Sequence, residues 1–430
     1  MTFEQARKVA DAVLFEGYVL YPYRASAQKN QARWQFGVLV PRAWSEAGSG
    51  EPWSSQTECL VDPGDGRDAV LEARVRFLRL QTRTVTDAAS RPVASLEVDG
   101  SVLPAWDEGV EEEAGVEVAL AALAVGERVV PIELAGGRDV APVRDSSGAL
   151  VGRVVRERWP VSALLTLAAE RLDGPYGLVR LRVRTENLTP WAGPGPAGSG
   201  GHAAGGSPGS AGVGGHPADG GGPGSMSPRG AERDLALRRS LAGAHTLLAV
   251  SSGAFVSLLD PPEWAAPAVA SCVNAETFPV LVGEPGRPDV VLSSPIILYD
   301  HPVVAPESPG DLFDATEIDE ILTLRTMALT DEEKREARGT DQRAAAIIDR
   351  VDAMPAEVLG RLHGAVRYPE PQAVHYPEPQ AIRLPGAPVE YPRRAGVRLP
   401  AGPGCPTAAP MLDRLSRGGG RAAGTRERPP

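Results

Sequence analysis

Hydrophobic residues recur at helical spacing at the start of the chain and at strand spacing through much of residues 34–298. At residues 3–15 they recur every three or four positions, which predicts an amphipathic helix that ends at Gly17. At residues 178–184 aliphatic residues alternate with arginines, and a period of two places each kind on one face of a strand. Asp99-Gly100 and Asp145–Gly148 are typical of tight turns between strands. Further strands are predicted at residues 34–40, 75–80, 93–98, 129–134, 150–155, 163–169, 246–250, 254–259, 278–282 and 290–298.

A helical pattern returns after residue 300. Residues 316–325 place Ile318, Ile321 and Leu322 on one helical face, and Thr330-Asp-Glu-Glu333 has the sequence of a capping box. Helices are also predicted at residues 341–351 and 355–363. The predicted fold class is therefore mainly β, with an antiparallel β-sandwich-like body, an N-terminal helix and a small C-terminal helical subdomain.

Two segments differ from the rest in composition. Residues 192–230 hold 16 Gly and 6 Pro and almost no large apolar side chain, so they are predicted to be disordered. Because a β pattern resumes after them, we interpret them as a loop inserted within one β domain, with a linker between two domains as the alternative. Residues 368–430 are predicted to form a disordered, Pro- and Arg-rich tail, which could also fold back or contact an acidic partner. The predicted division is 1–191 (helix and first strands), 192–230 (insert), 231–300 (remaining strands), 301–367 (helical subdomain) and 368–430 (tail).

Composition narrows the class of protein. Gly and Pro number 48 and 41 among 430 residues, yet 42% of the chain is hydrophobic, which argues against a wholly disordered chain. Three scattered cysteines predict no disulfide framework, and the polar N-terminus lacks a secretory signal. No apolar stretch is long enough to span a bilayer, so we expect a cytoplasmic protein without membrane insertion. A net charge of −11 argues against nucleic-acid binding.

The sequence holds few of the residue types and motifs that metal binding or catalysis requires. Cys59, Cys272, His245 and His301 lack the spacing of metal ligands, so no metal or cofactor is predicted, with a long-range Cys59–His301 site as an alternative. No phosphate loop, nucleophile elbow or zinc-protease motif occurs, and no catalytic residue is assigned. The acidic run at 107–113 is predicted to be a solvated surface rather than an acid–base pair.

One segment, residues 18–34, combines aromatic, basic and amide side chains. Aromatic residues with arginine are typical of interface anchors. The residues predicted to bind a partner are Tyr21, Tyr23, Arg24, Lys29, Asn30, Arg33 and Trp34. The same segment could instead hold an anion, or pack its aromatic rings on the β core.

Two stretches, residues 21–37 and 309–325, resemble uncharacterised actinobacterial proteins that are associated with the gene neighbourhoods of [NiFe]-hydrogenases. The resemblance extends in outline over residues 10–367. It implies a non-catalytic accessory or assembly protein whose protein partner is a hydrogenase subunit or maturation factor. The aromatic and basic segment and the absence of site chemistry make residues 18–34 and 316–329 the expected contacts with a partner. An enzyme with a site built from distant residues in a β-domain cleft, and a metal-delivery protein, are the alternatives.

Overall fold

The computed structural model describes residues 3–27, 33–64, 69–174, 177–193, 228–284, 286–302, 310, 312, 319–360 and 362. All of them belong to one compact unit, Met1–Val366. Most of the predicted insert and the whole of the predicted tail lie outside the described residues.

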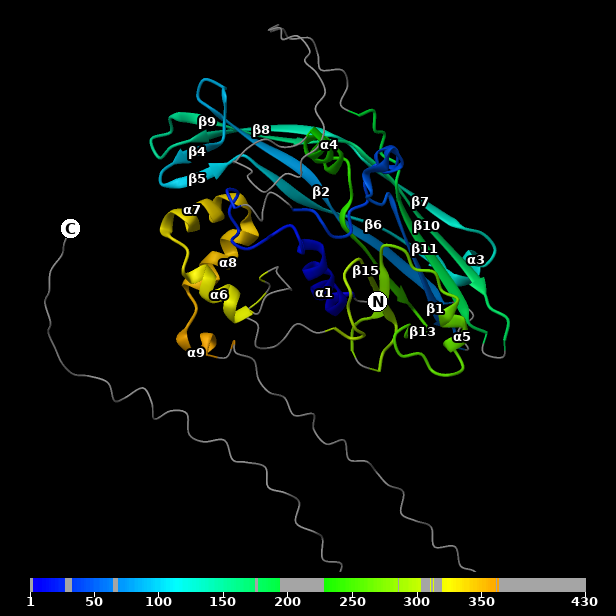
Figure 1. Ribbon diagram of the computed structural model, residues 1–430. Helices are drawn as coiled ribbons and strands as arrows, with labels where there is room; N and C mark the ends of the chain where they lie inside the picture. The colour runs from blue at the N-terminus through cyan, green and yellow to red at the C-terminus, as the bar shows by residue number, and fades with distance from the viewer. Residues whose placement is uncertain are drawn as a thin grey trace, which may run out of the picture. The chain divides into compact units, whose positions relative to one another are not determined.

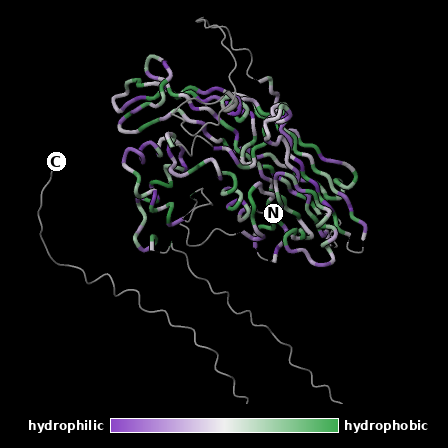
Figure 2. The backbone as a smooth tube through the Cα atoms, viewed as in Figure 1, coloured by the Kyte–Doolittle hydropathy of each residue, from purple (hydrophilic) through white to green (hydrophobic). Residues whose placement is uncertain are grey.

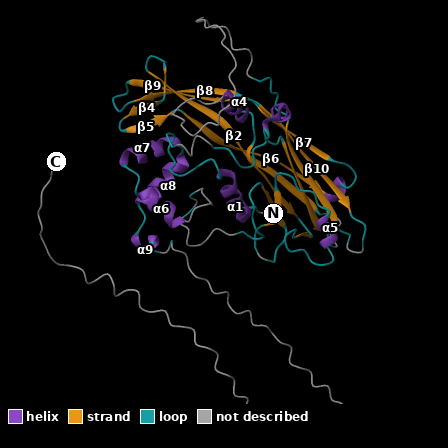
Figure 3. Ribbon diagram, viewed as in Figure 1, coloured by secondary structure: helices purple, strands orange, loops and turns teal. Residues whose placement is uncertain are grey.

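The described chain is mainly β and its sheets are antiparallel, so the predicted fold class is confirmed (Figures 1 and 3). The strands are β1 (Ser54–Asp62), β2 (Val70–Asp87), β3 (Pro92–Val93), β4 (Ser95–Val98), β5 (Ser101–Pro104), β6 (Trp106–Ala119), β7 (Arg128–Leu134), β8 (Gly137–Arg144), β9 (Leu150–Arg158), β10 (Val161–Arg171), β11 (Val179–Asn187), β12 (Ala242–Val250), β13 (Ala254–Val256), β14 (Phe278–Leu281) and β15 (Val290–Ser294). The helices are α1 (Glu4–Phe15), α2 (Arg42–Trp44), the π-helical turn η2 (Ser45–Ser49), α3 (Leu120–Leu123), α4 (Pro228–Leu237), α5 (Ala266–Ala270), α6 (Asp319–Met327), α7 (Asp331–Thr340), α8 (Gln342–Asp352) and α9 (Ala356–Leu359).

Two sheets form the sandwich. One has the strand order β13-β1-β11-β10-β7, and the other has the order β14-β15-β12-β2-β9-β8, with β3 and β6 also paired to β2. The 18-residue strand β2 is the axis of the larger sheet, since β6 follows it from Val70 to Arg83 while β12 and β9 pair with successive parts of it (Figure 1). The strands before and after residues 192–230 share both sheets, because β12 pairs with β2 and β13 pairs with β1.

Side chains of β2 contribute to two different hydrophobic cores. Leu71, Val75 and Phe77 belong to the core that β2 shares with the smaller sheet. Leu78 and Leu80 belong to a second core, which contains the N-terminal segment and helices α4, α6, α7 and α8. Figure 2 shows hydrophobic and hydrophilic residues alternating along the long strands, as expected when each strand has two different faces.

The C-terminal helices pack on the rest of the chain instead of forming a separate body. Helix α7 lies against the β4–β5 hairpin and against α8 (Figure 3). The predicted capping box is confirmed, because the Thr330 hydroxyl accepts from the Glu333 amide while the Glu333 carboxylate accepts from the Thr330 amide. The hairpin turn is also confirmed, with Asp99 and Gly100 both in the left-handed region at φ 49° and 78°.

Three details of the predicted pattern are wrong. Residues 34–40 form only an isolated bridge between Leu39 and Leu241, because Trp34 and Gly37 adopt positive φ values of 65° and 56° that bend the backbone. The strand predicted at 290–298 ends at Ser294. Strands β6 and β8 were not predicted at all, because charged residues, glycine and proline dilute their hydrophobic pattern.

Candidate functional site

The described part of the segment singled out in the sequence, residues 18–27 and 33–34, lies between the larger sheet and the C-terminal helices. Tyr23, Arg33 and Trp34 are buried, and Tyr21 and Arg24 are half-buried. Lys29 and Asn30 lie outside the described residues. Tyr23, Arg33 and Trp34 are therefore packed within the protein and do not lie on an exposed protein-binding surface.

The segment is instead held by the chain's own C-terminal helices. The Tyr23 hydroxyl donates to the Leu312 carbonyl oxygen at 3.0 Å, and the Thr340 hydroxyl donates to the Tyr23 carbonyl oxygen at 2.8 Å. Arg24 forms an ion pair with Glu333 of α7. The aromatic and basic side chains, which are typical of interfaces between proteins, therefore form an interface between two segments of the same chain. They join positions more than 280 residues apart in the sequence.

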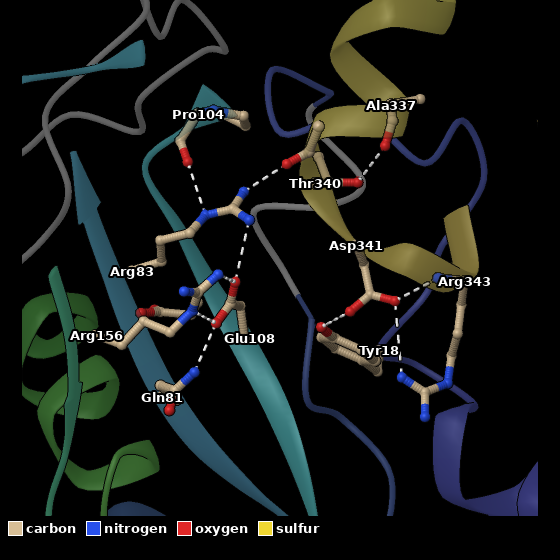
Figure 4. A network of polar contacts seen from close by, with 12 residues as sticks. Tyr18, Gln81, Arg83, Pro104, Glu108, Arg156, Ala337, Thr340, Asp341 and Arg343 are labelled. Atoms are coloured by element: carbon tan, nitrogen blue, oxygen red, sulfur yellow. Dashed lines mark hydrogen bonds and ion pairs between the residues drawn. The ribbon is translucent and has the colours of Figure 1, made fainter. Parts of the chain in front are cut away.

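Tyr18 and Asp341 form a further contact between this segment and the C-terminal helices (Figure 4). The Tyr18 hydroxyl donates to Asp341 Oδ2 at 2.6 Å, and the other carboxylate oxygen accepts from the Arg343 amide at 2.8 Å as the N-cap of α8. Burial, followed by the neighbouring Asp341 charge, raises the pKa of Tyr18 above its ordinary value. Tyr18 therefore remains a hydrogen-bond donor throughout the physiological pH range.

A second group of polar contacts lies beside it, where β2 and β6 meet α7 (Figure 4). Arg83 donates to Glu108 at 3.0 Å, to the Pro104 carbonyl oxygen at 3.0 Å and to the Gly339 carbonyl oxygen at 2.6 Å. Glu108 also accepts from Arg156 at 2.9 Å and from the Gln81 amide at 2.6 Å. A buried guanidinium and a nearly buried carboxylate thus connect β2, β5, β6, β9 and α7.

The acidic run at 107–113 is only partly the solvated surface that its composition suggested, since Glu111 and Glu113 are exposed whereas Asp107, Glu108 and Glu112 are half-buried. It lies on β6, and its carboxylates pair with arginines of β2, several of them buried. Glu113 contacts Arg7, Arg74 and Arg76; although burial acts to raise its pKa, the hydrogen bonds and charges of Arg74 and Arg7 hold that pKa below the ordinary value. The missed signal is the alternation of Ala114, Val116 and Val118, which pack against the sandwich core.

A cleft with a volume of about 380 Å³ opens where residues 18–34, β2, β6 and α4 meet. Its lining combines two indole rings, three arginines and two carboxylates. These groups come from Trp34, Trp106, Arg33, Arg83, Arg233, Asp107 and Asp234. Two residues that the sequence predicted to bind a partner, Arg33 and Trp34, therefore lie at the cleft, while the other residues of its lining were not singled out.

Arg33 is held in place by aromatic rings. The carbon of its guanidinium lies 3.6 Å from the centre of the Trp106 ring, 5.0 Å from that of Trp34 and 5.5 Å from that of Tyr18. Its Nη1 donates to the Asp107 carbonyl oxygen at 3.0 Å. Burial lowers the pKa of Arg33 to about 10, so the side chain is still positively charged at neutral pH. The cation–π contacts are favourable for a desolvated cation.

Asp234 supplies a carboxylate to the same cleft from helix α4. Burial raises the pKa of Asp234, and the nearby Asp107 charge raises it further, against the opposing effect of Arg238 and Arg233. A half-buried carboxylate with a raised pKa in a cleft is a group that can accept a hydrogen bond from a ligand or exchange a proton with it.

The residues of the alternative metal site do not line this cleft. Cys59 is buried in the sandwich core, where burial and then the neighbouring Cys272 raise its pKa. Burial raises the pKa of Cys272 to about 11. The ring of His301 contacts the Gly283 carbonyl oxygen at 3.3 Å. Within the described part of the chain, no three His, Cys, Asp or Glu residues are grouped closely enough to hold a metal ion.

Comparison with known proteins finds no matching family model, no similar curated protein and no similar solved structure. Among the described helices, none combines the length and the apolar character needed to cross a bilayer.

Proposed function

We propose that this chain is a non-catalytic accessory protein that binds a protein partner through helix α6. The observation that carries the proposal is a row of exposed apolar side chains, Ile321, Leu324 and Met327, on a helix whose opposite face is buried. Their exposed fractions are 37%, 46% and 46%. Single exposed apolar residues are common on protein surfaces, whereas a contiguous group is typical of an interaction site.

Helix α6 presents this row in a fixed orientation. Leu322, Thr323 and Thr326 are fully buried, and the Thr326 hydroxyl donates to the Leu322 carbonyl oxygen at 2.7 Å. Side chains three positions apart lie on neighbouring turns of a helix, so Ile321, Leu324 and Met327 form one stripe. A preformed stripe lowers the entropy lost on binding, since little has to be ordered when the partner arrives.

The charge around the stripe indicates what kind of partner fits. Asp331 and Glu332 are exposed at the start of α7, directly after α6, and the whole chain carries a net charge of −11. The complementary partner has an apolar groove with a basic rim. The resemblance of residues 309–325 to hydrogenase-associated proteins makes hydrogenase subunits and maturation factors the first partners to test.

The test is affinity purification of the tagged full chain from its native cell, compared between Leu324→Glu and a control, Val125→Glu. Val125 is 91% exposed and lies just after α3, so the control adds the same charge at an apolar surface position off the stripe. We expect Leu324→Glu to lose a co-purifying protein that Val125→Glu retains. Equal recovery with both folded variants would refute docking on α6. A lost partner unrelated to hydrogenase would refute only the hydrogenase assignment.

A further inference from the structure

The charged groups that line the cleft fall into two classes. Arg83, Arg233 and Asp107 have partners within the protein. Arg83 pairs with Glu108, Arg233 donates to Glu51 at 2.8 Å, and the Asp107 carboxylate accepts from a threonine hydroxyl at 2.7 Å. These three side chains are held in place by the fold, and they shape the cleft.

Arg33 and Asp234 belong to the second class. Among the described residues, neither side chain forms an ion pair within 4.0 Å, and the described hydrogen bond of the Arg33 side chain uses one guanidinium nitrogen, donating to the Asp107 carbonyl oxygen. Arg33 is 6% exposed, and the nearby charges of Asp107 and Asp341 favour its charged form although neither carboxylate forms an ion pair with it within 4.0 Å. Three aromatic rings also favour the cation and hold the guanidinium in place in the lining of the cleft.

We propose that the cleft binds a small molecule whose carboxylate or phosphate group contacts Arg33 and whose ammonium or hydroxyl group contacts Asp234. Arginine suits the first role because its planar guanidinium presents paired donors that match the oxygens of a carboxylate or phosphate. A volume of about 380 Å³ is at the lower end of the range for small-molecule sites, so the ligand is small. The indole of Trp34 provides an apolar wall for the part between its two polar groups.

The raised pKa of Asp234 fits this arrangement. Burial and the charge of Asp107 disfavour the free carboxylate, and a cationic ligand group beside it would reverse that effect. Ligand binding by Asp234 should therefore lower the pKa of its carboxyl group. This site is independent of the stripe on α6, because none of its residues belongs to that helix.

Calorimetric titration of the full chain with four probes tests the proposal. Inorganic phosphate and acetate carry only the oxyanion, whereas phosphoethanolamine and β-alanine also carry an ammonium group. We expect the two-group member of at least one pair to bind about tenfold or more tightly than its one-group member, because a charge-assisted contact with Asp234 is added. The pair that binds identifies the ligand as a phosphate or a carboxylate. No saturable binding of any probe at millimolar concentration would overturn the proposal.

Variants assign the binding to the cleft. Arg33→Met should abolish binding, and Asp234→Asn should remove only the advantage of the two-group probe. The control Arg91→Met, at a residue that is exposed and distant in the sequence, should bind as wild type. Because Arg33→Met also removes the stacking with three rings, Ala105→Trp serves as a second variant. Ala105 is exposed at the cleft, so a large side chain there blocks entry without disturbing the core. Wild-type affinity in folded Ala105→Trp would show that the anion binds elsewhere.

Discussion

Replacing Gly339 by alanine should destabilise the protein, although alanine is the better helix former. Gly339 lies in the last turn of α7, where the helix meets β5. A Cβ atom at this position would lie 2.0 Å from the Val102 carbonyl oxygen and 3.0 Å from Pro104 Cδ. Cβ atoms essentially never approach another heavy atom more closely than 3.0 Å, so the helix and the hairpin must separate by about 1 Å.

The size of the effect depends on three contributions. Alanine gains about 1 kcal/mol over glycine in a helix interior. Relief of the steric overlap costs about 1–3 kcal/mol, as in other overpacked sites. Separation of α7 from the sheet also lengthens the 2.6 Å hydrogen bond from Arg83 to the Gly339 carbonyl oxygen, and a hydrogen bond from a charged group contributes about 1.5–3 kcal/mol. The net loss in free energy of unfolding should be about 2–4 kcal/mol.

The assay is urea denaturation of the full chain, followed by circular dichroism, with Gly360→Ala as the control. Gly360 ends helix α9, and a Cβ atom there would lie 3.7 Å from the Ala356 carbonyl oxygen, an ordinary contact. The control should be unchanged or more stable by up to about 1 kcal/mol. A Gly339→Ala protein as stable as wild type would refute the close approach of α7 to β5.

Three further perturbations test the buried polar groups. Burial lowers the pKa of His245 from 6.5 to about 4, so between these pH values the unfolded chain binds a proton that the native state does not. The contribution of His245 to the free energy of unfolding should be complete above pH 6.5 and fall by up to about 3 kcal/mol as the pH drops towards 4. Urea denaturation across this pH range should show that His245→Asn loses this dependence on pH. Tyr18→Phe should cost about 1–2 kcal/mol in the free energy of unfolding, and a double-mutant cycle with Asp341→Asn that shows no coupling would contradict the hydrogen bond between them. Glu108→Gln removes the charge that faces Arg83 and Arg156 and should cost about 2–4 kcal/mol, whereas thermal unfolding at an unchanged temperature would show that the ion pairs contribute little.

Patterns among residues close together in the sequence predicted the helices, caps and strands that such residues specify. The amphipathic spacing of residues 3–15 predicted α1, and Thr330 with Glu333 predicted the start of α7. The alternation at 178–184 predicted β11, whose Leu181 and Val183 face the core. Capping and periodicity depend on residues a few positions apart, so the sequence displays them directly.

Strand β6 is an element that local patterns did not predict. The sequence favours a solvated surface for its glutamates because they lie together in a polar stretch. In the fold, Glu108 and Glu112 lie beside Arg83 and Arg79 of β2, about 30 positions earlier in the chain. Which charges neutralise one another is a property of strand register, and the hydrophobic pattern of a single strand does not specify its partner.

The sequence by itself determined the fold class, the caps and turns, and the aromatic and basic character of residues 18–34. The tertiary structure decided how that segment is used. It buries Tyr23 and Trp34 against helices from the far end of the chain, and it places Arg33 and Asp234 in the lining of one cleft, where neither forms an ion pair within 4.0 Å among the described residues. The physical reason is that burial and charge pairing depend on which distant segments meet, whereas periodicity and capping depend only on near neighbours.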